Sequence, residues 1–418
     1  MPANSTTPDR LSGQVLIIGN YRQTLTVIRS LAAEDYQLVL GIDGDAAGPE
    51  HSRYIREVWH HPPIASNNMT FASALEELLS RRKDIAFLFP IGEDEMIAII
   101  DIRQRLPAHL KILMPATETV RTCLDKSAML QVVDHLHIPQ ARHATVSSLN
   151  ELHAAADRIG YPLVIKPTDS SFKLLGGKAV ISPHADALHT LLSSWPVGER
   201  RLIVQRHAGG VRHNVYFFAT NGKLIQASQV RIFRTDQPDD TGLAVSGVTV
   251  ALDPKLEKHS RTLLRHLAYT GMGCVQFQVD EENDTLSFLE LNPRLGANFA
   301  IAYKAGLNLP KMAIELAEGR LDTTAPEYNK PCKVGLHYAW THGELLALKN
   351  AIANRGINLK TVLSRLLLIG RTFVTSSVHV TWSWKDPLPT LYLYKELLHV
   401  PLKRVWPFTA SAENKKNL

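Results

Sequence analysis

Apolar residues in the first quarter of the chain come in short runs, separated by stretches with helical periodicity. Residues 14–19, 37–43 and 85–90 are predicted to be buried strands, and a helix is predicted over residues 24–33. Strands that alternate with helices favour a parallel sheet with crossover helices. We therefore predict a Rossmann-like α/β region over residues 1–115. The first strand is not followed by Gly-x-Gly-x-x-Gly, so no dinucleotide site is predicted.

The acidic segment Gly92-Glu93-Asp94-Glu95 follows the third of these strands. Ligands of open α/β sheets bind beyond the carboxyl ends of the strands, so this segment could present polar groups to a ligand. It could equally be the start of a helix, where acidic residues are favoured by the helix dipole.

A hairpin is predicted over residues 273–292, where two runs of β-forming residues flank the polar turn 281–284. Because side chains alternate between the faces of a strand, the hairpin has an apolar and a polar face. The apolar face is predicted to contain Val275, Phe277, Val279, Leu289 and Leu291. The polar face gathers Gln276, Glu290 and Asn292, with Arg294 just beyond the strand. Three oxygen-bearing side chains suit a hard cation such as Mg²⁺, and an arginine suits a phosphoryl group.

Further motifs precede the hairpin. In chain order they are Asp125-Lys126 at the start of a helix over 127–137, a strand over 163–167 with Lys166, a polar loop over 168–178 with Gly176 and Gly177, and a strand over 201–207 that leads into Gly209-Gly210.

Together with Glu290-Leu-Asn292-Pro-Arg294, this series resembles the ATP-grasp superfamily over about 170 residues. Glu290, Asn292 and Arg294 match its Glu-x-Asn-x-Arg motif, and Gln276 resembles the variant of the carbamoyl-phosphate synthetase large subunit. The resemblance implies an α/β and α+β chain. Its parts would be a pre-ATP-grasp domain over 1–115, an ATP-grasp domain over 116–320 with a lid over about 141–201, and a C-terminal extension over 321–418.

The resemblance also implies site roles. Gln276, Glu290 and Asn292 would bind Mg²⁺, or Mn²⁺ in its place, and Arg294 and Arg231 would act on the transferred phosphoryl group. The ATP-binding residues would be Lys126, Lys166, Lys173, Gly176, Gly177, Gln205, Arg206 and His207. Relatives have a glutamate near Arg206 and His207 and more glycines in the loop, and both departures leave the nucleotide contacts there open.

The C-terminal region is predicted to contain helices over 345–354, 359–369 and 391–398 and an alternating strand over 373–384. Its many aromatic residues favour either a core that holds the extension in place or an interfacial surface for lipid-linked or saccharide substrates.

The composition of the chain limits the class of protein to which it can belong. With 45% hydrophobic and 21% charged residues and a net charge of +6, the 418-residue chain is typical of a globular protein with two or three domains and lacks a nucleic-acid-binding signature. Three dispersed cysteines argue against a disulfide framework. No signal peptide or membrane span is predicted, so we expect a cytoplasmic protein.

The function expected is that of an ATP-dependent carboxylate–amine ligase, with small-molecule substrates and an acyl-phosphate intermediate. A homodimer is compatible with the resemblance. Two alternatives stay open, namely carboxylation or carbamoyl phosphate formation by the same fold, and a nucleotide-binding module without turnover.

Overall fold

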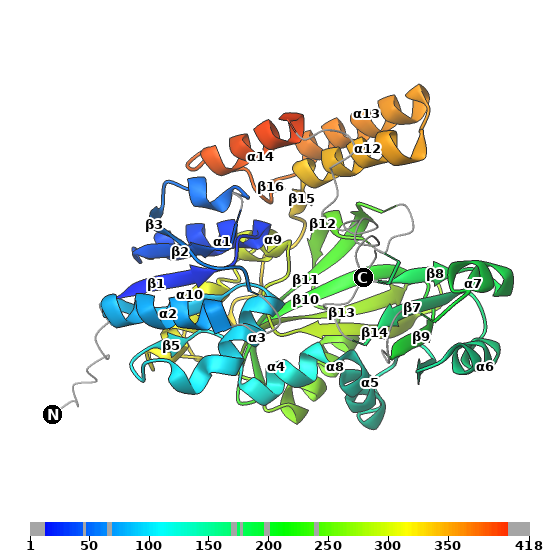
Figure 1. Ribbon diagram of the computed structural model, residues 1–418, viewed down its shortest axis with the longest axis horizontal. Coiled ribbons are helices and arrows are strands. Elements are labelled where there is room, and N and C mark those ends of the chain that lie inside the picture. Colours follow the sequence, from blue (N-terminus) through cyan, green and yellow to red (C-terminus); the bar gives the residue numbers. More distant parts are fainter. Residues whose placement is uncertain are drawn as a thin grey trace, which may run out of the picture.

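The computed structural model describes residues 13–44, 47–64, 69–168, 174–175, 179–195, 201–237 and 242–399. Their strands form three sheets, with five, four and seven strands. Helices separate and cover these sheets, and a layer of C-terminal helices lies along one side of the molecule (Figure 1).

The first sheet is parallel throughout and has the strand order β3-β2-β1-β4-β5. Its strands are β1 (Gln14–Ile18), β2 (Leu38–Ile42), β3 (Ile55–His60), β4 (Ile85–Pro90) and β5 (Lys111–Ile112). The helices of this part are α1 (Arg22–Ala32), α2 (Met69–Arg81), α3 (Glu93–Ile102) and α4 (Thr117–Leu124), with short 3-10 turns at Pro49–His51 and Arg103–Arg105. Helices α2 and α3 pack on one face and α1 on the other. Strands buried on both faces read as continuous apolar runs, which is why the sequence predicted them.

The second sheet is antiparallel, with the order β6-β9-β7-β8. It comprises β6 (His143–Val146), β7 (Leu163–Pro167), β8 (Val180–Ser182) and β9 (Leu202–Arg206), with α6 (Leu149–Ile159) and α7 (Ala185–Leu191). One face of β7 and β9 packs against the helices through Leu163, Ile165, Leu202 and Val204. The side chains on the opposite face of these two strands point away from α6 and α7, so they can contact other parts of the molecule.

The third sheet has the order β14-β13-β10-β11-β12-β15-β16. Its strands are β10 (Val211–Thr220), β11 (Lys223–Thr235), β12 (Ala244–Val250), β13 (Gly271–Asp280), β14 (Thr285–Asn292), β15 (His337–Ala339) and β16 (Val378–His379). Helices α5 (Lys126–His135) and α8 (Pro254–His266) cover one face. On the other face, α9 (Phe299–Lys304) and α10 (Leu309–Ala317) share a continuous apolar core with α1. This shared core packs the five-stranded sheet against the seven-stranded one.

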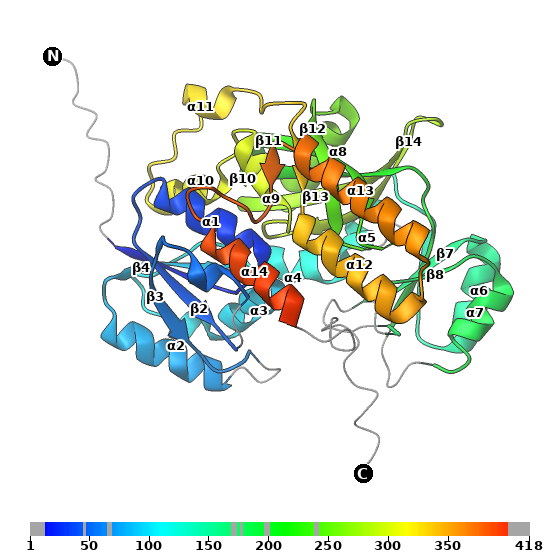
Figure 2. The ribbon, with the colours of Figure 1, turned by 90° about the horizontal axis from the view of Figure 1, so that it is seen from above.

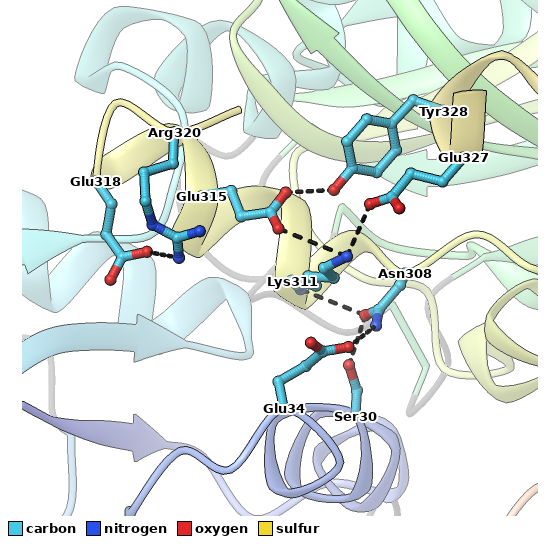
Figure 3. A network of polar contacts seen from close by, with 9 residues as sticks. All are labelled: Ser30, Glu34, Asn308, Lys311, Glu315, Glu318, Arg320, Glu327 and Tyr328. Carbon is cyan, nitrogen blue, oxygen red and sulfur yellow. Dashed lines mark hydrogen bonds and ion pairs between the residues drawn. The ribbon is translucent and has the colours of Figure 1, made fainter. Parts of the chain in front are cut away.

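A polar network reinforces this contact (Figure 3). The hydroxyl of Ser30 on α1 donates to Oδ1 of Asn308 over 2.5 Å, and Asn308 caps the start of α10. Farther along α10, Lys311 bridges Glu315 and Glu327 at 3.5 and 2.8 Å. Because Ser30 lies on α1 and Asn308 caps α10, their hydrogen bond fixes α1 relative to α10.

The C-terminal region consists of α11 (Pro326–Asn329), α12 (Thr341–Arg355), α13 (Leu359–Thr375) and α14 (Leu388–His399). The buried carboxylate of Asp386 anchors this region to the first sheet. It accepts hydrogen bonds from Arg29 Nε at 3.0 Å, from the Ser52 hydroxyl at 2.9 Å and from the Arg53 amide at 3.0 Å. Strands β15 and β16, from beyond residue 320, complete the seven-stranded sheet. The domain boundaries at 115 and 320 stay a prediction.

Two local predictions are wrong. Residues 373–375 belong to the last turn of α13, and between them and Trp384 only Val378–His379 forms a strand. In the hairpin, a bulge inserts Leu289 between the pairs Gln276–Glu290 and Phe277–Phe288. Phe288, and not Leu289, consequently joins the core beside Leu291.

Candidate active site

The polar residues of the hairpin lie together on the face of the seven-stranded sheet that α5 and α8 leave uncovered. Gln276 is opposite Glu290, and Cys274 is opposite Asn292. The amide Nδ2 of Asn292 donates to Oε1 of Glu290 over 2.8 Å. This hydrogen bond holds the two side chains side by side, so their oxygens are presented from neighbouring positions.

Arg294 lies just beyond β14 and is held by a carboxylate from the first sheet. Its Nε and Nη2 donate to Oε1 of Glu93 over 3.0 and 2.5 Å. Glu93 is the first residue of α3 and follows the carboxyl end of β4. Burial opposes the charge of Arg294, but the carboxylates of Glu93 and Glu290 outweigh it and raise the pKa of this guanidinium. Arg294 therefore stays charged.

Lys166, on β7 of the four-stranded sheet, approaches the carboxylate of Glu290. Strand alternation places it on the face opposite Leu163 and Ile165, away from the core under α6 and α7. Burial lowers the pKa of Lys166 to about 8; Glu290 opposes this shift, and the neighbouring Lys126 adds to it. Lys126 begins α5, and its Nζ donates to the carbonyl of Pro167 over 3.4 Å. Two cations thus lie side by side near the polar face of the hairpin.

Gln205 shares the face of the four-stranded sheet that bears Lys166. Its backbone pairs with Val164 on β7, and its side chain is 4% exposed. The amide nitrogen Nε2 has no hydrogen-bond partner among the described residues. A buried donor without a partner is costly, so this atom suits a ligand acceptor.

Of the other predicted residues, the structure describes Arg231, Arg206 and His207. Arg231 lies on the opposite face of the seven-stranded sheet, since it pairs with His213, and its guanidinium binds Glu281 at 3.0 Å. Arg231 is therefore not on the face that bears Gln276, Glu290 and Asn292, and its predicted role toward the transferred phosphoryl group stays a prediction. Arg206 alternates away from Gln205, and His207 lies beyond the end of β9. Lys173, Gly176 and Gly177 lie outside the described residues.

The structure adds residues that sequence reasoning missed. Asn214 on β10 lies opposite Gln276, and its buried Oδ1 lacks a partner among the described residues. Two positions earlier, Arg212 shares this face and donates to the carbonyl of Gly242 over 3.3 Å. The alternation of β10 could have revealed both, had its pairing with β13 been known.

A further arginine comes from the first sheet. Arg22, at the start of α1, stacks on the Trp340 ring at 3.5 Å from its centroid. Burial lowers the pKa of Arg22 to about 10, an effect that Tyr338, Tyr216 and Asp236 oppose and Arg212 increases. No local sequence signal marks Arg22.

The oxygen donors fit a divalent cation that is shared with a ligand. Gln276, Glu290, Asn292 and Asn214 offer amide oxygens and a single carboxylate, the ligand type that Mg²⁺ and Mn²⁺ accept. In the described part of the chain, no three His, Cys, Asp or Glu residues gather as a metal cluster. With one negative charge the site would hold a metal weakly by itself, so nucleotide phosphates would have to supply further oxygens.

Comparisons with known proteins bear on the family and the fold of the chain. A family model described as "ATP-grasp in the biosynthetic pathway with Ter operon" matches residues 199–342. The chain has the ATP-grasp fold and is similar in sequence to ATP-grasp proteins, which confirms the resemblance found from its motifs.

Among particular relatives, the carbamoyl phosphate synthase large chain of Acidobacterium capsulatum is 26% identical over 245 residues, which cover 55% of this chain and 22% of the relative. The chain therefore spans about a fifth of that relative's length. An N5-carboxyaminoimidazole ribonucleotide synthetase in complex with ADP has a TM-score of 0.62 at 10% identity, covering 89% of this chain and 99% of that one. The L-amino acid ligase of Bacillus licheniformis has a TM-score of 0.60 at 12% identity, covering 79% of each.

Proposed function

We propose that this protein is an ATP-dependent ligase that joins a carboxylate to an amine through an acyl phosphate. The observation that carries the proposal is the position of Glu290. Its carboxylate interacts electrostatically with Lys166 from the four-stranded sheet and with Arg294, which Glu93 holds from the five-stranded sheet. Three separate parts of the fold thus bring charges of both signs to one place, as transfer of an anionic phosphoryl group requires.

The nucleotide would lie between the four-stranded and seven-stranded sheets. Lys166 and Lys126 would offset the charge of its phosphates, and the unpartnered Nε2 of Gln205 would donate to the adenine edge. Gln276, Glu290 and Asn292 would hold Mg²⁺ or Mn²⁺, which would neutralise charge on the phosphates. The contacts of Lys173, Gly176, Gly177, Arg206 and His207 stay predictions from the resemblance.

In the first step, a carboxylate oxygen of the acid attacks the γ-phosphorus while the bond to the leaving ADP oxygen breaks. In the second, the amine attacks the acyl carbon and inorganic phosphate leaves, with the amine proton passing to solvent. Arg294 would stabilise the negative charge in both steps, because its planar fork can hold two oxygens at once. The ion pair with Glu93 would fix the orientation of that fork before the substrate arrives.

The acid would lie beside the first sheet, where Arg22 and Arg212 add positive charge to the polar face of the hairpin. Nη1 of Arg22 and Nε of Arg212 are buried without a partner among the described residues. Both donors suit a carboxylate. Amino acids are the first substrates to test, since a structural neighbour is named L-amino acid ligase.

Carboxylation or carbamoyl phosphate formation is the second candidate. It is favoured by the similarity to carbamoyl phosphate synthase large chains, although the alignments cover only part of those proteins.

The decisive experiment measures phosphate release from Mg²⁺–ATP with amino acids, peptides and sugar acids, alone and with amines. The ligase proposal requires release that depends on both an acid and an amine. With ¹⁸O in the acid's carboxylate, one label must appear in the released phosphate. Product without label in phosphate would exclude the acyl phosphate. Release driven by bicarbonate alone would support the second candidate, and nucleotide binding without turnover would indicate a non-catalytic module.

A further inference from the structure

The outer surface of α13 carries a stripe of exposed apolar side chains, one of which, Phe373, contacts the ring of His379 at 4.5 Å between ring centroids. Its members are Leu359, Leu363, Leu366, Leu367, Phe373 and Val374, all exposed. At 100° per residue these positions span about 120° of the helix circumference. Val374 is 81% exposed and Leu367 76%, whereas Ile369, just outside this span, is buried. We call this set the α13 stripe.

Exposed apolar side chains also occur on α14 and in the segment just before it. Trp384 is 87% exposed and Leu398 82%, and Leu388 and Leu391 are also exposed. Viewed from above, α12, α13 and α14 lie at the surface of the molecule with no described element over them (Figure 2). A shallow hollow of about 520 Å³ runs along the first turns of α13. A run of exposed apolar side chains along a whole helix marks an interaction site in a folded protein.

The exposed charge that borders the α13 stripe is basic. Lys360 and Arg371 are exposed and border the α13 stripe, and Lys385 is exposed beside Trp384. The acidic residues between 341 and 398 are Glu344, Asp386 and Glu396. The first two are buried in ion pairs with arginines, so they leave the exposed basic charge uncompensated.

We propose that the α13 stripe binds the surface of an anionic lipid bilayer. A helix with an apolar face and basic residues at its border lies in the plane of the membrane, with its apolar side chains among the acyl chains and its cations at the headgroups. None of the described helices is long and apolar enough to cross a bilayer. The protein would rest on the membrane and keep its ATP-grasp site in water.

A second copy of the chain fits this surface less well. A twofold dimer would place the same surface of each copy against the other, bringing Lys360 and Arg371 toward the like charges of the partner. An anionic bilayer instead supplies the opposite charge beside Lys360 and Arg371.

The test is co-sedimentation of the full chain with vesicles of phosphatidylcholine alone or with 30% phosphatidylglycerol. Binding should need the anionic lipid and weaken as salt is raised. The double substitution Leu363→Glu with Leu367→Glu should lower partitioning at least about tenfold, because two apolar anchors become charged. Lys360→Glu with Arg371→Glu should weaken binding to the anionic vesicles and leave the apolar stripe intact. Val334→Glu, at an exposed apolar residue outside these helices, is the matched control and should bind as the unaltered protein does.

All substituted residues are exposed, so circular dichroism should show an unchanged fold. Absence of vesicle binding would overturn the proposal. Vesicle binding that the stripe substitutions leave unchanged would also overturn it, and would assign the binding to another segment of the chain. A dimer in solution that these substitutions dissociate, without vesicle binding, would overturn it in favour of a second copy.

Discussion

Lys166 allows the proposed nucleotide site to be tested by pH. Burial lowers its pKa to about 8, so at pH 9 about 90% of this lysine is neutral and at pH 7 about 90% is charged. Bound phosphates favour the charged ammonium. Binding of Mg²⁺–ADP should therefore take up about 0.9 proton at pH 9 and about 0.1 at pH 7. Above pH 8 the affinity should fall toward tenfold per pH unit.

The nucleotide does not confound this signal, since phosphate groups of this kind titrate near pH 6. Isothermal titration calorimetry in buffers with different ionisation enthalpies counts the protons directly. Lys166→Arg, which keeps its charge at all these pH values, should abolish the proton uptake at pH 9. Lys166→Met should weaken binding at pH 7 and flatten the profile. Lys258→Met removes an exposed lysine of α8 and should keep the profile of the unaltered protein. Equal proton uptake at pH 7 and 9 would refute the reasoning.

The remaining predictions concern the metal, the phosphoryl group and the C-terminal anchor. Glu290→Gln should keep the fold, weaken Mg²⁺–ATP binding and lower turnover by several orders of magnitude, because the one charged ligand is lost; unchanged rates would disprove the assignment. Arg294→Lys should lower kcat far more than nucleotide affinity, while Glu93→Gln, which leaves Arg294 in place, should lower kcat by about ten- to hundredfold. Equal losses in kcat and affinity for the lysine variant would contradict a transition-state role. Asp386→Ala should lower the unfolding free energy by about 3–5 kcal/mol in urea denaturation, since it removes the buried carboxylate that pairs with the half-buried guanidinium of Arg29. The exposed Lys385→Ala should have little effect, and a similar loss in both variants would argue against the anchor.

Local patterns predicted most of the elements in the sequence. The strands β1, β2, β4, β7 and β9 and the helices α1, α5 and α12 lie where the pattern placed them. Each is a run of a single hydrophobic period, which the chain specifies without distant contacts. The prediction for residues 373–384 was wrong because this segment is not a single element. Alternating polarity there suggested a strand, but the residues divide between the end of α13, a two-residue strand and an irregular segment.

For the candidate site, the sequence alone identified the residues that share the polar face of the hairpin. Gln276, Glu290 and Asn292 were expected on one face from alternation, and their register confirms it. The prediction that Leu289 lies on the apolar face failed, because a bulge depends on how the strand pairs with its partner and not only on its own sequence. Arg231 was expected near the γ-phosphate on the basis of relatives, and its pairing with β10 places it on the face opposite Gln276 and Glu290.

Only the tertiary structure decided which distant residues complete the site. The pairing of Glu93 with Arg294, the approach of Lys166 to Glu290 and the stacking of Arg22 on Trp340 each join separate parts of the fold. A local pattern fixes the face on which a side chain lies, because backbone geometry repeats along a strand or helix. It carries no information about the element packed against that face. That choice is made when the sheets associate through their shared apolar core, and the charges of the site then come together.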